Sequence, residues 1–163
     1  MVITQQHLIE PTRASEVEDI LSISRGVGVF DEVEIAAVDE LLNDYLTLGP
    51  QQSGYYFLSC RREGRVLGFA CYGPRALTYG TFDLYWIVTD KASHGQGIGG
   101  ALLSRVAEEV RAQGGRMIVA ETSGRPDYAS TRRFYETHGY ERAATIADFY
   151  APNDDLVIYV QRL

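Results

Sequence analysis

A strand-like run that leads through a glycine-rich loop into an amphipathic helix is the feature that most constrains this fold. The run ends with Ile87, Val88 and Thr89, and the loop reads His94-Gly95-Gln96-Gly97-Ile98-Gly99-Gly100. Glycines let a backbone approach a ligand closely, and the N–H groups of a first helical turn have no partner inside the helix. The segment therefore predicts an anion site suited to phosphate or pyrophosphate. A flexible loop with glycine caps is the structural alternative.

The periodicity of the apolar residues changes along the chain. Strand-like runs are predicted at residues 2–9, 55–61, 66–72, 81–89, 116–122, 140–147 and 156–162. Helical periodicity is predicted at residues 14–24, 33–48, 97–113 and 127–138, with Asp127 as the cap of the last helix. Hairpins and helical crossovers alternate, which predicts an α/β fold with a mixed, mostly antiparallel sheet of six to seven strands and about four helices.

The length of the chain limits it to one domain. It has 163 residues, of which 45% are hydrophobic, so a sizeable core is expected in a single domain over residues 1–163. No apolar run approaches the roughly 18–20 residues that span a bilayer, and residues 1–10 lack the features of a secretory signal. We therefore expect no membrane partner and a cytoplasmic location.

The charge is acidic and unevenly distributed. The net charge of -7 argues against nucleic acid as a partner, because phosphate contacts need clustered Lys and Arg. Residues 1–50 hold ten acids and two bases, whereas the remaining 113 residues hold 12 acids and 13 bases. These N-terminal acids are either the solvated faces of helices or a field that attracts a cationic partner.

Cysteine and histidine form no ligand pattern. Cys60 and Cys71 lie in strand-like stretches and predict buried free thiols rather than a disulfide framework. His7, His94 and His138 are far apart and match no zinc spacing. We therefore expect no metal.

The glycine loop also fits a dinucleotide fingerprint. Residues 95–100 satisfy G-x-G-x-x-G, and Glu121 follows at about the 20-residue distance at which such folds place a ribose-binding acid. In those folds the first glycine follows the strand almost at once, whereas residues 89–94 intervene here. Nicotinamide binding is therefore disfavoured.

Two motifs together resemble the GNAT acetyltransferase superfamily. His94-Gly95-Gln96-Gly97-Ile98-Gly99 is similar to its acetyl-CoA pyrophosphate loop, Q/R-x-x-G-x-G/A. Phe134-Tyr135-Glu136-Thr137-His138-Gly139-Tyr140 is similar to its F/L-Y-E-x-x-G-F/Y motif. The order of predicted elements agrees with that family over essentially the whole chain. Tyr128 stands where many members have an asparagine that contacts CoA.

The resemblance implies which residues bind acetyl-CoA. The backbone of Ile87, Val88 and Thr89 would hold the pantetheine and polarise the acetyl carbonyl. The pyrophosphate would lie against the loop and the helix N-terminus, which consist of Gly95, Gln96, Gly97, Ile98, Gly99 and Gly100. Tyr128 is the remaining candidate contact. Arg132 and Arg133 either pair with CoA phosphates or are solvated surface arginines.

The resemblance also suggests the groups that move protons. Tyr135 is the candidate general acid, since a phenol stays protonated at neutral pH and can donate to a leaving thiolate. A core tyrosine is the alternative. Glu121 is the candidate base, or else a paired surface acid, and Asp83 is its rival. Asp83 and Tyr85 share one face of their strand, and Tyr150, expected just past a strand end, either lines the acceptor site or packs against its neighbours.

Taken together, these features predict an acetyl-CoA-dependent N-acetyltransferase that acts by direct transfer in a ternary complex. The alternative is a non-catalytic CoA-binding sensor on the same fold. The expected partner is a small-molecule or peptide amine, and a homodimer is one option for the assembly. The acidity of the predicted helices in residues 14–48 favours a cationic amine.

Overall fold

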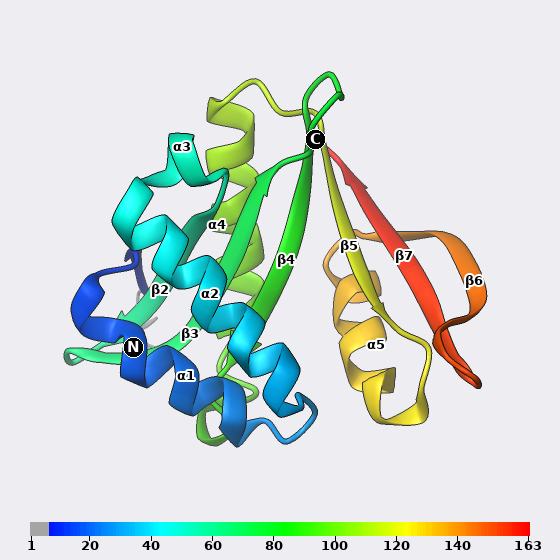
Figure 1. Ribbon diagram of the computed structural model, residues 1–163, viewed down its shortest axis with the longest axis horizontal. Coiled ribbons are helices and arrows are strands. Elements are labelled where there is room, and N and C mark those ends of the chain that lie inside the picture. The colour runs from blue at the N-terminus through cyan, green and yellow to red at the C-terminus, as the bar shows by residue number, and fades with distance from the viewer. Residues whose placement is uncertain (1–6) are drawn as a thin grey trace, which may run out of the picture. The chain divides into compact units, whose positions relative to one another are not determined.

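The computed structural model describes residues 7–163, which form a seven-stranded mixed sheet and five α-helices (Figure 1). The strands are β1 (Leu8–Pro11), β2 (Tyr56–Arg62), β3 (Arg65–Pro74), β4 (Thr81–Thr89), β5 (Met117–Ser123), β6 (Glu141–Ala151) and β7 (Asp154–Arg162). Their order in the sheet is β1-β2-β3-β4-β5-β7-β6. β4 and β5 are parallel, whereas the β1–β2, β2–β3, β5–β7 and β6–β7 pairs are antiparallel. The predicted α/β fold with a mixed sheet is confirmed.

The helices are α1 (Val17–Gly26), α2 (Glu32–Leu48), α3 (Pro50–Ser53), α4 (Ile98–Ala112) and α5 (Ala129–Thr137). Short 3-10 turns lie at Ala14–Glu16, Lys91–Ser93 and Pro126–Tyr128. The sequence predicted four helices and missed α3, because Gly49-Pro50 was interpreted as a stop. Proline there occupies the first helical position, where its missing N–H costs nothing.

Most boundaries differ from the prediction by one to three residues, and three differences, at β1, α5 and β6, affect predicted residues. The first strand was expected at residues 2–9, but β1 covers Leu8–Pro11, and residues 2–6 lie outside the described part. Asp127 does not cap α5. Tyr128 holds that position, and Asp127 instead accepts hydrogen bonds from Arg125. β6 continues to Ala151, so that Tyr150 lies inside the strand rather than past its end.

The chain folds into two compact units, and the division between them falls within β3, β4 and α4. Unit 1 runs to Tyr72 and takes in Trp86–Val106, and unit 2 comprises Gly73–Tyr85 and Ala107–Leu163. Each unit is described separately below. That the whole chain is one domain stays a prediction.

In unit 1, α1 and α2 cover one face of the sheet and α4 covers the other (Figure 1). Apolar residues of α1 and α2 pack against β2, β3 and the end of β4 in one core, which contains Ile20, Val38, Leu42, Phe57, Phe69 and Val88. Both predicted free thiols, Cys60 and Cys71, are buried in these strands. On the other face, a Cβ atom at Gly68 would lie 3.0 Å from Ile98 and 3.3 Å from Leu102. Gly68 therefore lets α4 approach β3 closely.

A buried ion pair fastens β1 and the turn before α1 to β2. Arg61 of β2 is only 6% exposed, and its Nη2 donates to Glu16 Oε2 at 2.8 Å and to the Pro11 carbonyl at 2.9 Å. Its Nε also donates to Glu16, and its Nη1 donates to Glu10 at 3.1 Å. The guanidinium of Arg61 thus joins β1 and the turn before α1 to β2.

In unit 2, α5 lies against β5 and β7, and β6 forms the edge of the sheet. Every residue of β6 is exposed. Its pairing with β7 shifts register twice, between Arg142 and Ala144 and again between Ile146 and Ala151. These bulges leave one short regular stretch, at residues 144–146.

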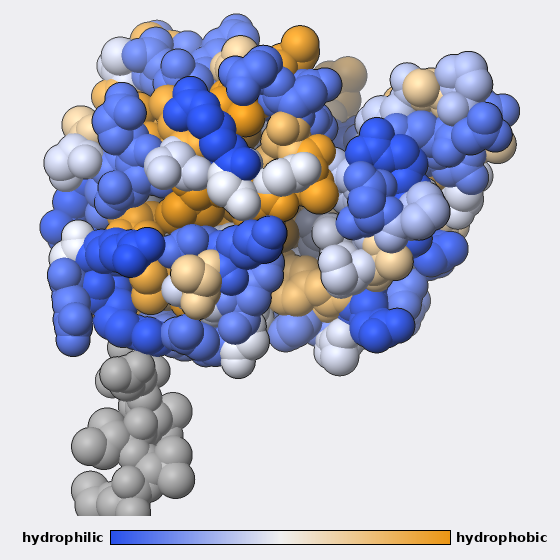
Figure 2. Space-filling model, turned by 90° about the horizontal axis from the view of Figure 1, so that it is seen from below, coloured by the Kyte–Doolittle hydropathy of each residue, from blue (hydrophilic) through white to orange (hydrophobic). Residues whose placement is uncertain are grey.

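The face of the molecule seen in Figure 2 is mostly hydrophilic, with hydrophobic side chains showing between the polar ones. Such scattered exposure is normal, because a folded chain has too little polar surface to cover it completely. The most exposed large apolar residues are Leu77 and Tyr79, in the connection between β3 and β4, and Val33 near the start of α2.

We expect Gly115→Ala to lower the free energy of unfolding by about 1–3 kcal/mol. A Cβ atom at this turn would lie 2.2 Å from Val110 Cγ1, 2.8 Å from the Val110 carbonyl oxygen and 2.9 Å from Phe82. Gly26→Ala is the matched control, since no described heavy atom lies within 4 Å of its Cβ, and its effect should stay within about 1 kcal/mol. Urea unfolding compares the two. Equal stabilities would contradict the steric argument.

Candidate functional site

The glycine loop of unit 1 ends where α4 begins. Gly95 and Gly97 have φ values of +79° and +77°, which L side chains rarely adopt, so glycine is strongly favoured at both positions. The first helical hydrogen bond runs from the Ala101 N–H to the Gly97 carbonyl. The N–H groups of residues 98–100 are therefore not used within the helix. The predicted anion site thus has its donors in place.

Side chains from β2 and from the segment before β1 hold this loop. His7 Nε2 donates to the Gln96 carbonyl at 3.0 Å, and Arg62 Nη1 donates to Gln96 Oε1 at 2.8 Å. At the start of the loop, His94 Nε2 donates to the Thr89 carbonyl at 3.3 Å. Both oxygens of Gln96, the side-chain Oε1 and the backbone carbonyl, thus accept hydrogen bonds that hold the loop.

β4 extends beyond its pairing with β5. The parallel ladder joins Thr81 to Met117 at one end and Leu84 to Ala120 at the other. Within residues 7–163, β4 residues 85–89 have no partner in that ladder. The backbone groups of Ile87, Val88 and Thr89 on this side therefore lie outside that ladder, like those of an open strand edge.

Tyr135 lies in a cluster of aromatic rings in unit 2. It projects from α5 and is 5% exposed, with ring centroids 5.3 Å from Tyr140, 5.5 Å from Tyr159 and 5.7 Å from Phe134. Burial raises the pKa of the Tyr135 phenol well above its ordinary value of 10. Tyr135 therefore keeps its proton at neutral pH, and in a proton transfer it can act as an acid but not as a base.

We expect Tyr140→Phe to raise the free energy of unfolding by about 1 kcal/mol. The Tyr140 hydroxyl is buried and finds no hydrogen-bond partner among the described residues. A buried polar group without a partner costs stability, so removing it while keeping the ring should recover part of that cost. Urea unfolding of the variant measures the difference. A clear loss of stability would mean that the hydroxyl has a partner, such as an ordered water.

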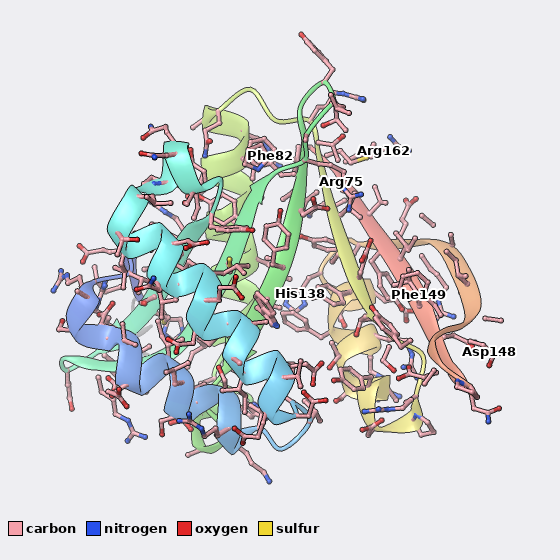
Figure 3. All side chains as sticks on the ribbon, viewed as in Figure 1. Arg75, Phe82, His138, Asp148, Phe149 and Arg162 are labelled. Atoms are coloured by element: carbon pink, nitrogen blue, oxygen red, sulfur yellow. The ribbon has the colours of Figure 1, made fainter. Side chains whose placement is uncertain are left out.

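Asp83 and Glu121 are brought together in unit 2 by Arg75, which sequence reasoning missed. Arg75 follows β3 and lies near the upper parts of β4 and β5 in Figure 3. Its Nε lies 2.9 and 3.0 Å from the two Asp83 carboxylate oxygens, and its Nη2 lies 2.7 Å from Oδ1. The same Nη2 lies 3.6 Å from Glu121 Oε1. Both carboxylate oxygens of Asp83 thus accept hydrogen bonds from Arg75, whereas the contact of Glu121 with Arg75 is longer.

Glu121 and Tyr135 lie at opposite faces of β5. Ala120 pairs with Tyr159, on which the Tyr135 ring stacks, and side chains alternate along a strand. Glu121, the next residue, therefore points to the other face. A reaction that uses both Glu121 and Tyr135 must therefore take place where the β4–β5 ladder has ended. Tyr85 of β4 and Glu121 of β5 are the first residues beyond that ladder.

The other predicted aromatic residues lie at the surface of unit 2. Tyr85 is 38% exposed on β4, and Tyr128 is half-buried, with the Arg125 guanidinium 5.3 Å from its ring centroid. Tyr150 is exposed on the bulged part of β6, in edge contact with Phe149.

The two arginines of α5 differ. Arg132 donates to the carbonyl groups of Ser123 and Arg125 at 2.8 and 2.9 Å, so it ties α5 to the end of β5 rather than being solvated. Arg133 is exposed, which is compatible with both alternatives. Among residues 7–163, no group of three or more His, Cys, Asp or Glu side chains is arranged to hold a metal ion. No helix in that range is long and apolar enough to cross a membrane.

Comparisons with known proteins agree with these features. A family model described as an acetyltransferase (GNAT) domain matches residues 53–142. A solved structure from Desulfovibrio desulfuricans, assigned to the GNAT family, is 35% identical with a TM-score of 0.92, and the match covers 96% of this chain and 99% of that one. No match was found among curated protein sequences.

More distant structures share the fold. The ribosomal-protein-S18-alanine N-acetyltransferase of Escherichia coli is 18% identical with a TM-score of 0.74, and 96% of this chain and 94% of that one are covered. An aminoglycoside 6'-N-acetyltransferase complexed with coenzyme A is 14% identical with a TM-score of 0.76, and 95% and 96% are covered.

Proposed function

The chain belongs to the GNAT acetyltransferase family, and we propose that it transfers the acetyl group of acetyl-CoA to a primary amine by direct attack in a ternary complex. The observation that carries the proposal is the loop at Gly95 and Gly97, whose backbone leaves the first N–H groups of α4 available. An aminoglycoside acetyltransferase of this fold has been solved with coenzyme A, which supports the same donor here.

Acetyl-CoA would be held mainly by backbone groups. The N–H groups of Ile98, Gly99 and Gly100 would bind the pyrophosphate, and the loop residues Gly95, Gln96 and Gly97 would surround it. Ile87, Val88 and Thr89 would pair with the amide groups of the pantetheine as an added strand does. Tyr128 would add a side-chain contact.

Tyr135 would donate the proton that the leaving thiolate requires. Its position supports this role, because the phenol is protonated at neutral pH and three neighbouring rings hold it in place. The thioester supplies the electrophilic carbonyl, and polarisation of that carbonyl is assigned to the backbone of residues 87–89.

Glu121 would accept the proton that the ammonium of the acceptor must lose before attack. Its rival Asp83 has both carboxylate oxygens bound by Arg75, and a carboxylate so engaged is a poor proton acceptor. Glu121 is 43% exposed at its side chain, so an amine or a relaying water can reach it. Tyr85 and Tyr150 would contact the acceptor.

The acceptor would be a small-molecule or peptide amine. Proteins of the same fold are named as N-acetyltransferases of an alanine in ribosomal protein S18 and of an aminoglycoside at its 6' nitrogen. The acidic side chains of α1 and α2, including Glu18, Asp19 and Glu40, are exposed and favour a cationic amine.

Two measurements test the proposal. Isothermal titration calorimetry should show micromolar binding of acetyl-CoA and none of NADH. Release of the CoA thiol should then be followed with a peptide that begins with alanine, an aminoglycoside and spermidine, and at least one amine should accelerate it. Absence of acetyl-CoA binding would overturn the donor site. Binding without turnover on any amine would indicate a CoA sensor instead of an enzyme.

A further inference from the structure

The guanidinium of Arg75 is held along one edge only. Its Nε and Nη2 lie 2.7–3.0 Å from the two carboxylate oxygens of Asp83, which comes from β4 in the same unit. The side chain of Asp83 is only 12% exposed, so this contact fixes the direction of the guanidinium. The side chain of Arg75 is itself 46% exposed. Its charge is therefore fixed in place and accessible to a ligand.

The other edge of this guanidinium has donors available. Among residues 7–163, the hydrogen bonds of Arg75 use Nε, Nη2 and the backbone, and none uses Nη1. An arginine carries five N–H donors in one plane, and a carboxylate fits that arrangement well. Nη1 of Arg75 is thus suited to bind a carboxylate of a ligand.

A negative charge lies directly beside this cation. Glu121 of β5 has 43% of its side chain exposed, and its Oε1 lies 3.6 Å from Arg75 Nη2. This distance is within the range of an ion pair but too long for a direct hydrogen bond, so the guanidinium does not occupy the Glu121 oxygens. Unit 2 therefore presents one accessible positive and one accessible negative group at neighbouring positions.

We propose that Arg75 and Glu121 form a recognition site for an α-amino acid, whose ammonium binds at Glu121 and whose carboxylate binds at Arg75 Nη1. The inference rests on the proposed function, in which Glu121 receives the acceptor amine, and it names the class of acceptor. In an α-amino acid a single carbon atom joins the two charged groups. Two protein charges in direct contact are spaced to match them.

The balance of charge favours this zwitterion over a simple ion. At neutral pH the site consists of the Arg75 cation and the carboxylates of Asp83 and Glu121. A carboxylate without an amine would meet two like charges, and a polyamine would meet the like charge of Arg75. An α-amino acid places an opposite charge beside each accessible group. It is thus the ligand for which neither accessible charge is repulsive.

The same charges favour release of the product. As the amine nitrogen bonds to the acetyl carbon, the C–S bond breaks, the proton of the ammonium passes to Glu121 and the thiolate takes a proton from Tyr135. The product amide has lost its positive charge and keeps its carboxylate. It therefore meets Asp83 and Glu121 as an anion and should bind less tightly than the amino acid.

Pairs of amines that differ only in the carboxylate test this site. The common α-amino acids and their α-amides are compared as acceptors by release of the CoA thiol. For the most active pair, we expect Arg75→Ala to lower the ratio of kcat/KM for the acid to kcat/KM for the amide by about 10-fold or more, as for loss of a hydrogen bond between charged groups. Differences in the intrinsic reactivity of the two amines cancel, because every variant is measured with the same pair.

A second variant and a control accompany Arg75→Ala. Arg75→Lys keeps Asp83 paired, but one ammonium cannot reproduce the planar donors that bind Asp83 and a ligand together, so the ratio should fall here as well. Arg142→Ala is the matched control. The Arg142 side chain is 49% exposed and pairs with Glu136 at 3.4 Å, also in unit 2, and its removal should leave the ratio unchanged.

Two results would overturn the site and leave acetyl transfer standing. One is an equal loss of kcat/KM for acid and amide in Arg75→Ala, and the other is turnover of spermidine, an aminoglycoside or a peptide but of no amino acid. Calorimetry of the same amino acids with the CoA-bound protein tests the site without turnover. Binding that Arg75→Ala weakens, in a protein that acetylates no amine, would support the site and overturn the proposed enzyme function.

Discussion

Tyr135→Phe is expected to lower kcat by about 10²–10⁴-fold while leaving acetyl-CoA binding unchanged. The substitution removes one hydroxyl and keeps the ring, which packs against Tyr140, Tyr159 and Phe134. Binding should survive, because the donor is assigned to backbone groups of unit 1. Steady-state kinetics, with calorimetry of acetyl-CoA binding on the same preparation, measures both effects.

Tyr79→Phe is the matched control for this experiment. Tyr79 is 86% exposed, and the contact that it makes with Arg116 uses its backbone carbonyl, so loss of its hydroxyl should leave kcat unchanged. An equal kcat in Tyr135→Phe and the unmodified protein would contradict the assignment of the general acid. A protein that binds acetyl-CoA but shows no turnover before mutation would instead be a sensor.

Arg61→Ala is expected to lower the free energy of unfolding by about 3–5 kcal/mol at pH 7. The loss arises because Glu16, which is 7% exposed, would keep its charge in a buried position without its partner. Arg61→Lys keeps the charge but loses the planar set of donors. Its free energy of unfolding should therefore lie between those of Arg61→Ala and the unmodified protein. Urea unfolding at pH 7 gives the values.

Acidification should reduce the difference in the free energy of unfolding between Arg61→Ala and the unmodified protein. Burial opposes the charged form of Glu16, but hydrogen bonds from Arg61 and Arg13 and the charge of Arg61 outweigh it and lower its pKa below the ordinary value of 4.5. A lowered pKa contributes stability that is present above pH 4.5 and is lost as the pH falls through the folded value. The stability difference between the two proteins should therefore shrink below about pH 4.5.

Arg65→Ala provides the comparison for Arg61→Ala. Arg65 starts β3 in the same hairpin and pairs with Asp90 at 2.9 Å, but its side chain is 69% exposed. An exposed pair contributes about 0–1 kcal/mol, so this variant should remain close to the unmodified protein. Similar losses in the two variants would mean that burial does not decide the strength of the Arg61 contact.

Sequence reasoning predicted the elements whose periodicity is strong. β4 begins and ends where it was predicted, and α2 and α4 deviate by one residue at each end or less. The glycine loop was recognised because a strand, a run of glycines and a helix follow one another directly. Four-residue α3 was missed, since one turn of helix has no measurable period. β6 was cut short because Asp148, with φ of 53°, interrupts its alternation.

The candidate site was predicted only where its residues lie in motifs. Tyr135 and the loop could be found in this way, whereas Arg75 could not. It lies in an irregular connection, and its link to Asp83 and Glu121 depends on three strands meeting in space. The spacing of Asp83 and Glu121 along the chain gives no sign of this contact. Glu121 was already the candidate base and Asp83 its rival, but the different contacts of the two carboxylates with Arg75 became visible only in the structure.

The bulges of β6 affect how this chain behaves beside other extended chains. An exposed edge strand of 11 residues would ordinarily act as a template on which a foreign strand, and then a fibril, can grow. Such growth needs an uninterrupted row of backbone donors and acceptors. In an average strand this row is about five or six residues long. Between its two register shifts β6 offers only residues 144–146 in regular pairing. Its edge is thereby protected against amyloid-like recruitment without any helix to cover it.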